Sequence, residues 1–378
     1  MVYLDNAATT FPKPDVVVKK IEECLYSYAV NVGRGSYPLA TQALAVVEET
    51  REQLGKMVNA SNRERVVLTP SATIAANEVI MGLSWDSFKT AYVTPFEHNA
   101  IARPVNLACN KVGASIRMIP FNPNTQMWDE DGTRRLFEQD TPDYVFINHV
   151  SNVTGVILPV EEIAKLAKQY GACVVVDASQ SLGLIDIDVQ KSCIDYLIFA
   201  GHKNLYASFG IGGFIANAES INPIISGGNG SDSLNLFMPK GFPVGFEAGS
   251  PNVVAISGLN ASVKWIEKIG RDNIKAKKQL LMEQLVSGLQ MNKKVRLYLP
   301  EGNHTSVLSL NVEEYTPHEV GVILGEEYDI AVRTGFHCAP YIHDLIGTRE
   351  RMGTVRISMS YFNSEGDVEA VISAINAL

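Results

Sequence analysis

Two residues with reactive side chains each follow a run of apolar residues that is typical of a buried strand. Asp177 ends the run 172–177, and Lys203 comes after the run 195–200 and a Gly-His turn. Because ligands of parallel α/β sheets bind at the carboxyl ends of the strands, we expect both side chains at such an edge. A desolvated lysine can lose its proton and form a Schiff base with an aldehyde, and a carboxylate can keep a pyridine nitrogen protonated. Taken singly, Lys203 also fits a solvated surface lysine, and Asp177 fits a cap of the next turn.

The order of periodic patterns predicts the elements that position these two residues. From about residue 14 to residue 250, stretches with a helical period alternate with short apolar runs, which is typical of a mostly parallel α/β sheet. One stretch, 159–170, starts with proline and two glutamates and ends before Gly171, so it predicts a surface helix.

The pattern changes beyond about residue 253. Two long helical stretches are followed by a strand-like run over 304–312, a helix near Pro317, a strand-like run over 354–360 and a helix from Ser364. At this length a single core is unusual. We therefore expect a large α/β domain over residues 1–252 and a smaller α+β domain over residues 253–378.

The composition limits the classes of protein to which the chain can belong. Of its 378 residues, 46% are hydrophobic and 19% are charged, which predicts a folded chain with a large core. A formal net charge of -9 disfavours nonspecific binding to nucleic acid or anionic lipid, and no apolar run approaches the roughly 18 residues of a membrane span. The five cysteines are scattered and the N-terminus lacks the features of a signal or transit peptide, so the cytoplasm is the expected location. We expect neither a nucleic-acid nor a membrane partner.

Seven sequence segments, in one order, resemble those of the class V, fold-type-I enzymes that depend on pyridoxal 5′-phosphate (PLP), and among them the cysteine desulfurases and selenocysteine lyases. They are Tyr3–Thr10, Glu97–Ala100, His149–Gly155, Val176–Gln180, Gly201–Lys203, Glu247–Asn252 and Val332–Ala339. The resemblance implies a large domain with a mostly parallel seven-stranded sheet, a smaller C-terminal α+β domain, and a first 13 or so residues that pack on the small domain. It also implies that Lys203 holds PLP as a Schiff base and that Asp177 pairs with its pyridine nitrogen.

The same resemblance assigns further contacts to the cofactor ring. His98 would stack over the ring, a role that suits a flat aromatic side chain. Asn152 and Gln180 would bond the ring hydroxyl oxygen and its surroundings. The open alternatives are a histidine that caps the following helix and two ordinary polar residues of loops.

The phosphate of PLP is expected at the N-terminus of a helix that Thr69–Thr73 opens, because free N–H groups and the helix dipole favour an anion. Ala72 and Thr73 would lie in this cradle, with His202 as a second donor. The family often has glycine and hydroxyl residues in the cradle and a serine where this chain has Ala200, so we expect one phosphate hydrogen bond to be missing. Ser250 resembles the hydroxyl residue that reaches the phosphate from a partner subunit, which implies a homodimer; alternatively it begins a turn.

Two arginines are candidates for binding the carboxylate of an amino-acid substrate, because a guanidinium can bind both of its oxygens. Arg356 lies in an alternating strand pattern and matches the carboxylate-binding arginine of the family, and Arg333 is the second candidate. Asn152 and Ala8 complete the expected substrate site. An exposed strand arginine that pairs with a surface acid is the alternative for Arg356.

Cys338 determines which reaction the resemblance implies. Its segment is similar to the loop of the group II cysteine desulfurases, whose cysteine becomes a persulfide, although Phe336 stands where the family often has histidine. A thiolate presented on a loop over PLP could accept sulfur from bound L-cysteine and leave L-alanine. A protein sulfur acceptor would then take the sulfur from Cys338. We interpret the other cysteines as buried and inert; they are Cys24, Cys109, Cys173 and Cys193.

Other functions stay open at this point. One is a selenocysteine lyase that acts on L-selenocysteine, or another class V PLP-dependent C–S lyase or aminotransferase. A second is a binding or scaffold protein that has kept only the fold. His337, Cys338 and His343 match no standard four-ligand zinc site, so we expect no metal, and the glycines of 227–230 are weak evidence for a dinucleotide loop.

Overall fold

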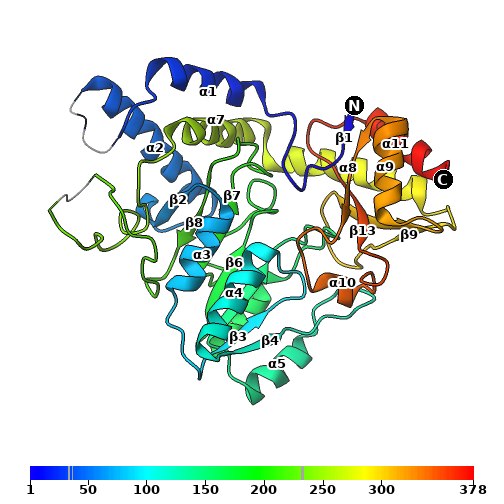
Figure 1. The fold of residues 1–378 in the computed structure, drawn as a ribbon, viewed down its shortest axis with the longest axis horizontal. Helices are drawn as coiled ribbons and strands as arrows, with labels where there is room; N and C mark the ends of the chain where they lie inside the picture. Colours follow the sequence, from blue (N-terminus) through cyan, green and yellow to red (C-terminus); the bar gives the residue numbers. More distant parts are fainter. Residues whose placement is uncertain (33–34, 36, 231–233) are drawn as a thin grey trace.

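The structure is a computed structural model of the chain and describes residues 1–32, 35, 37–230 and 234–378 (Figure 1). The strands are β1 (Val2–Tyr3), β2 (Val66–Thr69), β3 (Thr90–Val93), β4 (Ser115–Met118), β5 (Tyr144–Asn148), β6 (Cys173–Asp177), β7 (Tyr196–Ala200), β8 (Gly212–Ala216), β9 (Val295–Leu297), β10 (Val307–Val312), β11 (Ile330–Ala331), β12 (Arg333–Gly335) and β13 (Thr354–Ser358). The α-helices are α1 (Asp15–Ser27), α2 (Pro38–Met57), α3 (Ala72–Gly82), α4 (Asn99–Val112), α5 (Glu130–Gln139), α6 (Val160–Gln169), α7 (Val253–Ile269), α8 (Arg271–Leu289), α9 (Pro317–Tyr328), α10 (Ile342–Leu345) and α11 (Glu365–Asn376).

The large sheet joins seven strands of the described residues in the order β2-β8-β7-β6-β5-β3-β4. All neighbouring pairs from β7 to β4 are parallel, and only β8 runs antiparallel to both of its neighbours. Strands β5, β7 and β8 are buried at every residue, because helices cover both faces of the sheet. This confirms the predicted α/β fold with a mostly parallel seven-stranded sheet.

Successive residues of a strand point to opposite faces of the sheet, and this alternation divides the core of the large sheet in two. In β6, Val174 and Val176 pack in a cluster with side chains of α2, α6 and α7. Val175, between them, packs in a second cluster with side chains of α3 and α4. The apolar run 172–177 is therefore a strand that is buried on both faces, as its composition predicted.

The C-terminal part of the chain forms a second, antiparallel sheet with the strand order β12-β13-β10-β9. Side chains from α8, α9 and α11 cover this sheet and form a separate core with it. Helix α11 starts directly after Ser364, whose side chain makes a capping box with Asp367, so the predicted start of this helix is correct. Figure 1 shows these elements on one side of the large sheet.

The first residues of the chain lie against this second sheet. Strand β1 pairs with β11 in parallel, and Leu4 is part of the small core. By contrast α7, which starts at the predicted domain boundary, packs its apolar side chains in the core of the large sheet. The boundary between residues 252 and 253 stays a prediction.

Over the described residues, no helix combines the length and apolar character that a membrane crossing requires.

A buried ion pair anchors the segment that carries Ser250. Arg51 of α2 donates to both carboxylate oxygens of Glu247, at 2.6 and 2.5 Å, and the side chain of Arg51 is only 5% exposed. One of these oxygens also accepts from the backbone N–H of Leu68 in β2. Glu247 therefore ties the loop before Ser250 to the edge of the large sheet.

Replacing Glu247 by alanine is expected to lower the free energy of unfolding by about 3 kcal/mol. The substitution removes the bidentate partner of the buried Arg51 and leaves Glu48, at 3.4 Å, as its remaining ion-pair partner. Urea unfolding monitored by circular dichroism measures this. As a control, Glu219→Ala removes a partner of Arg65 from a pair whose glutamate is 75% exposed. It should change the free energy of unfolding by less than about 1 kcal/mol. Equal effects of the two substitutions would contradict the role given to Glu247.

Candidate active site

Lys203 and Asp177 lie at the carboxyl edge of the large sheet. Strands β6 and β7 are parallel neighbours, so the end of β6 at Asp177 and the turn after β7 that carries Lys203 are at the same edge. Asp177 is buried, and one of its oxygens accepts from the N–H of Ser179 at 2.9 Å. Burial lowers the pKa of Lys203, and the negative charge of Asp177 opposes this change. The two side chains are thus close enough to interact, as their strand-end positions predicted.

Charged groups from the C-terminal part of the chain also act on this amine. The positive charges of Arg356 and Arg333 lower the pKa of Lys203 further, whereas Cys338 raises it. Strands β12 and β13 pair so that Arg333 lies opposite Arg356. The structure therefore brings the two arginines and Cys338 together around Lys203. A lysine with a lowered pKa carries more of the neutral amine that acts as a nucleophile or base.

His98 caps helix α4. Its Nδ1 accepts from the N–H of Ala100 at 3.0 Å, which fixes the orientation of the ring. Burial lowers the pKa of His98 to about 4, and the nearby charge of Lys203 adds to this, so the imidazole is neutral at pH 7. The next residue, Asn99, donates its N–H to the carbonyl of Cys338 at 2.7 Å. The capping role is therefore observed, and stacking on a cofactor ring stays a prediction.

Asn152 and Gln180 both face protein carbonyl groups. Asn152 donates to the carbonyl of His337 at 2.7 Å, while its Oδ1 is buried without a hydrogen-bond partner among the described residues. Gln180 donates to the carbonyl of Ala7 at 2.8 Å. Ala8, the next residue, is partly buried and donates its N–H to the carbonyl of Asp5. These bonds join four of the predicted site segments in two pairs, 149–155 with 332–339 and 176–180 with 3–10.

The start of helix α3 fits an anion. Ser71 is the N-cap and accepts from the N–H of Ile74, and Ala72 and Thr73 are the first helical residues. Gly212 of β8 lies against this turn, since a Cβ on it would be 2.6 Å from the nitrogen of Ala72. Glycine at this position thus allows the helix end to lie directly on the sheet. The N–H groups of the first turn of α3, which have no partner within the helix, can donate hydrogen bonds to a phosphate.

His202 and Ser250, the two other predicted phosphate contacts, differ in their surroundings. His202 Nδ1 is buried without a hydrogen-bond partner in the described part of the chain, and burial lowers the pKa of His202 to about 4. The carbonyl of His202 accepts from Lys13 at 2.9 Å and from the N–H of Thr10 at 3.0 Å. Ser250 is exposed, and its hydroxyl accepts from the amide of Asn31 at 3.1 Å.

These groups fit PLP. A buried polar atom without a protein partner is usually paired by a ligand or water, and Asn152 Oδ1 and His202 Nδ1 are two such atoms. The N–H groups at the start of α3 suit a phosphate, and the buried carboxylate of Asp177 suits a protonated ring nitrogen. The individual contacts stay predictions.

Arg356 is buried in the middle of β13 and is only 2% exposed. It donates to the carbonyl of Asn152 at 3.0 Å and to the carboxylate of Asp5 at 2.5 Å, and its Nε has no partner among the described residues. Asp5 is not among the site residues that the sequence predicts. The signal for it was a carboxylate directly after a short apolar strand, inside the segment Tyr3–Thr10.

Cys338 lies at the surface on a turn with unusual backbone angles. Gly335, His337 and Cys338 have φ values of 96°, 49° and 56°, and for the two non-glycine residues this left-handed region is unfavourable. His337 holds the turn in place, since its Nε2 is 2.9 Å from the hydroxyl of Thr354. Arg333 approaches the sulfur of Cys338 at 3.7 Å. The thiol is thus exposed on an anchored turn.

The other cysteines are less accessible, but they are not all buried. Cys24 and Cys109 are buried, whereas Cys173 and Cys193 are only partly buried, so the expectation for these last two was wrong. Cys193 sits in a turn with φ 55°, and Cys173 is the first residue of β6, at the end opposite Asp177. Burial raises the pKa of Cys109 to about 11 and that of Cys173 to about 12, which keeps both as unreactive thiols.

The histidines next to Cys338 bind protein groups. The two ring nitrogens of His343 contact the hydroxyl of Thr348 at 2.7 Å and the carbonyl of Phe336 at 3.1 Å. The ring of Phe336 packs edge-on against His343, with 5.1 Å between the ring centroids. In the described ranges, no three His, Cys, Asp or Glu side chains gather as metal ligands. The glycines of 227–230 lie in an exposed loop and open no helix.

Comparisons with known proteins define the class of the enzyme. Residues 2–371 match the family of class-V aminotransferases. The chain is 34% identical to a probable cysteine desulfurase of Pyrococcus abyssi, over 100% of this chain and 94% of the relative. It is 31% identical to a cysteine desulfurase of Shigella sonnei, over 100% and 93% of the two chains.

A solved structure gives the same result. The apo structure of the cysteine desulfurase from Thermococcus onnurineus NA1 superimposes with a TM-score of 0.93 at 32% identity, over 100% of this chain and 94% of that chain. The fold and the arrangement of the site define an enzyme of the fold-type-I class. The chain belongs to the class-V aminotransferase family.

Replacing Gly212 by alanine is expected to weaken PLP binding about tenfold or more. The new methyl group would push the start of α3 away from β8, and such overpacking costs about 1–3 kcal/mol. Titration of the apoprotein with PLP, followed by visible absorbance, measures the Kd. The control is Gly325→Ala, because Gly325 is exposed on α9 and has no other atom near its Cβ position. An unchanged Kd in Gly212→Ala would contradict a phosphate at this helix end.

Proposed function

We propose that the protein is a PLP-dependent cysteine desulfurase that converts L-cysteine to L-alanine and takes up the sulfur on Cys338 as a persulfide. The observation that carries this proposal is the buried amine of Lys203, on which both Asp177 and the exposed Cys338 act electrostatically. Asp177 comes from the large sheet, and Cys338 comes from the turn after β12. The similarity to cysteine desulfurases over the whole chain supports the same reaction.

In this proposal the residues of the large sheet hold the cofactor. Lys203 would bind it covalently, Asp177 would keep its ring nitrogen protonated, and His98 would stack on its ring. The start of α3 and His202 would bind its phosphate, together with Ser250 of the partner subunit. When bound, PLP withdraws electrons from the substrate carbon next to the amino group.

The amino group of the substrate would displace Lys203, and the freed neutral amine of Lys203 would then act as the base. Its lowered pKa increases the share of neutral amine, which can take the proton from the substrate Cα and return a proton later. Arg356 and Arg333 orient the substrate through its carboxylate, and Asn152 and Ala8 border the same space. Because Arg356 already donates to Asp5, the substrate shares this guanidinium with a protein carboxylate.

Cys338 receives the sulfur. Its thiolate attacks the sulfur of the bound cysteine, the carbon–sulfur bond breaks, and the carbon skeleton takes up a proton and leaves as alanine. Arg333, a proposed ligand of the substrate carboxylate, lies 3.7 Å from the sulfur of Cys338, which supports a substrate bound next to this thiol. The exposed position of Cys338 also suits transfer of the persulfide to a protein sulfur acceptor.

The proposal extends to assembly and location. We infer a homodimer in which Ser250 reaches the phosphate site of the partner subunit, and the surface position of Ser250 supports this. The expected location is the cytoplasm. Size-exclusion chromatography with light scattering tests the dimer, and a monomer at micromolar concentration would contradict it.

Replacing Lys203 by alanine is expected to abolish the visible absorbance of the lysine-bound cofactor and to lower alanine formation by at least about 10⁴-fold. The substitution removes both the covalent attachment and the base. The control Lys191→Ala changes a lysine whose side chain is 69% exposed and should leave both signals unchanged. Persistence of the absorbance and the turnover in Lys203→Ala would contradict the central role of this residue.

Replacing Cys338 by serine is expected to stop sulfur release from L-cysteine, because serine cannot form the persulfide. It should spare much of the selenium release from L-selenocysteine, since selenium leaves more readily. Alanine formation from the two substrates measures this, and Cys193→Ser is the matched control. Unchanged activity on L-cysteine would rule out Cys338 as the acceptor and favour a selenocysteine lyase or another C–S lyase of the same family.

A further inference from the structure

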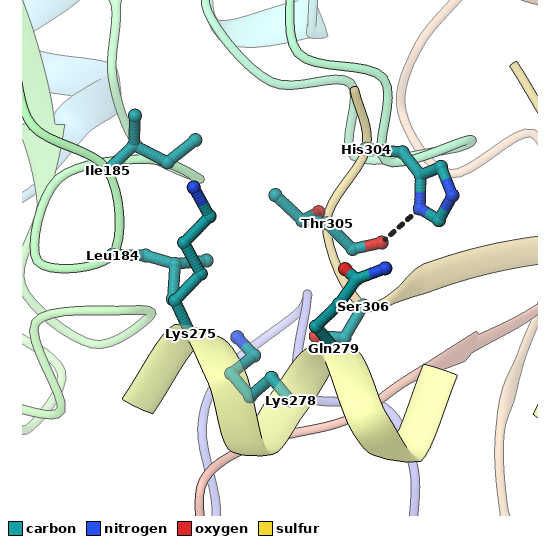
Figure 2. Close-up of a pocket in the computed structure, with 8 residues that line it drawn as sticks. All are labelled: Leu184, Ile185, Lys275, Lys278, Gln279, His304, Thr305 and Ser306. Atoms are coloured by element: carbon teal, nitrogen blue, oxygen red, sulfur yellow. Dashed lines mark hydrogen bonds between the residues drawn. The ribbon is translucent and has the colours of Figure 1, made fainter. Parts of the chain in front are cut away.

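A buried lysine lies outside the site described so far. Lys278 is on α8 and is 6% exposed, on the same helix face as the core residues Ile274, Leu281 and Leu285. Figure 2 shows Lys278 and Lys275 on α8 at a small pocket that Leu184 and Thr305 also line. Lys278 therefore sits where α8 faces the large domain.

The amine of Lys278 makes a hydrogen bond to Asn204, the residue that follows Lys203 in the sequence. Its Nζ donates to Oδ1 of Asn204 at 2.9 Å. The Nδ2 of Asn204 in turn donates to the carbonyl of Gln180 at 2.5 Å. The backbone of Asn204 also packs closely against Gly183, because a Cβ on Gly183 would lie 2.4 Å from the carbonyl oxygen of Asn204. A chain of hydrogen bonds thus runs from α8 to the residue next to Lys203.

This chain completes the anchoring of the backbone around Lys203. The carbonyl of Lys203 accepts from the hydroxyl of Thr10 at 2.9 Å and from the N–H of Tyr206 at 2.9 Å. The side chain of Asn204 is held by Gln180 and Lys278. The Lys203–Asn204 peptide is therefore fixed from three parts of the chain, and Lys278 is the contribution of α8.

Packing alone does not account for a lysine at this position. The pocket contains a second lysine and His304 but no carboxylate that could pair with Lys278, so burial lowers the pKa of Lys278 to about 7. A methionine has a similar volume and could fill the space between the apolar residues of α8 without this desolvation. What a methionine lacks is the donor to Asn204.

We propose that Lys278 is a positioning residue for Lys203, which acts through Asn204 to fix the direction from which the amine of Lys203 enters the active site. This inference rests on the proposed function, because it assumes that Lys203 carries the cofactor. Lys278 also couples α8, which packs in the small core, to the reactive amine of the large domain.

The test compares Lys278→Met with Lys275→Met in the PLP-loaded protein. In Lys278→Met we expect kcat for L-cysteine to fall about tenfold or more with a much smaller change in KM, because a displaced base affects the chemical step most. The pH at which the visible absorbance of the lysine-bound cofactor changes should move by about half a pH unit or more. Lys275 is exposed, and Lys275→Met should match the wild type in both measurements.

A double-mutant cycle with Asn204→Ala tests the route. If Lys278 acts through Asn204, the kcat of the double variant should equal that of Asn204→Ala alone. If the double variant is slower than Asn204→Ala by the same factor that Lys278→Met shows alone, the two residues act independently and the inference is overturned. A Lys278→Met variant that changes only in stability, with wild-type kcat and absorbance titration, would overturn it as well.

The failure of this inference can be told from failure of the proposed function. If only the inference fails, the wild type forms its visible complex and produces alanine, and Lys278→Met does the same at the same rate. If the proposed function fails, the wild type itself gives no visible complex with PLP and no alanine. That result would overturn both.

Discussion

The burial of the Lys203 amine beside the carboxylate of Asp177 is the constraint on which the rest of the site depends. Removal from water lowers the pKa of this amine, and two neighbouring arginines lower it further. The negative charge of the Asp177 carboxylate opposes this lowering of the pKa. The parallel pairing of β6 and β7 creates this arrangement, because it sets both residues at one edge of the sheet.

The other parts of the site come from three sections of the chain that are far from Lys203 in sequence. They are the first residues, strand β13 with Arg356, and the turn after β12. The first residues contact the Lys203 turn through Thr10 and the small sheet through the ion pair of Asp5 with Arg356. The turn after β12 supplies Cys338, which bonds the start of α4 through its carbonyl. The site therefore forms only when the two parts of the chain pack together. Because the charged groups around Lys203 come together at this contact, they are buried next to one another.

The sequence predicted those features of the fold and the site that depend on local patterns of residues. Buried apolar runs identified β6 and β7, and with them the edge at which Asp177 and Lys203 lie. The pairing of Asp5 with Arg356 could not be predicted in this way, because 351 positions separate the two residues and no periodic pattern links them. Lys278 had a local signal, since a lysine interrupts the apolar face of α8, but its partner Asn204 is known only from the packing of α8 on the large domain.

The measurement that tests the account most directly is the mass of the Cys338 peptide after the PLP-loaded protein has reacted with L-cysteine in the absence of reductant. The account predicts that this peptide gains one sulfur atom, that the peptide with Cys193 does not, and that alanine appears in an amount equal to the transferred sulfur. Alanine formation with no added sulfur on Cys338 would contradict the account.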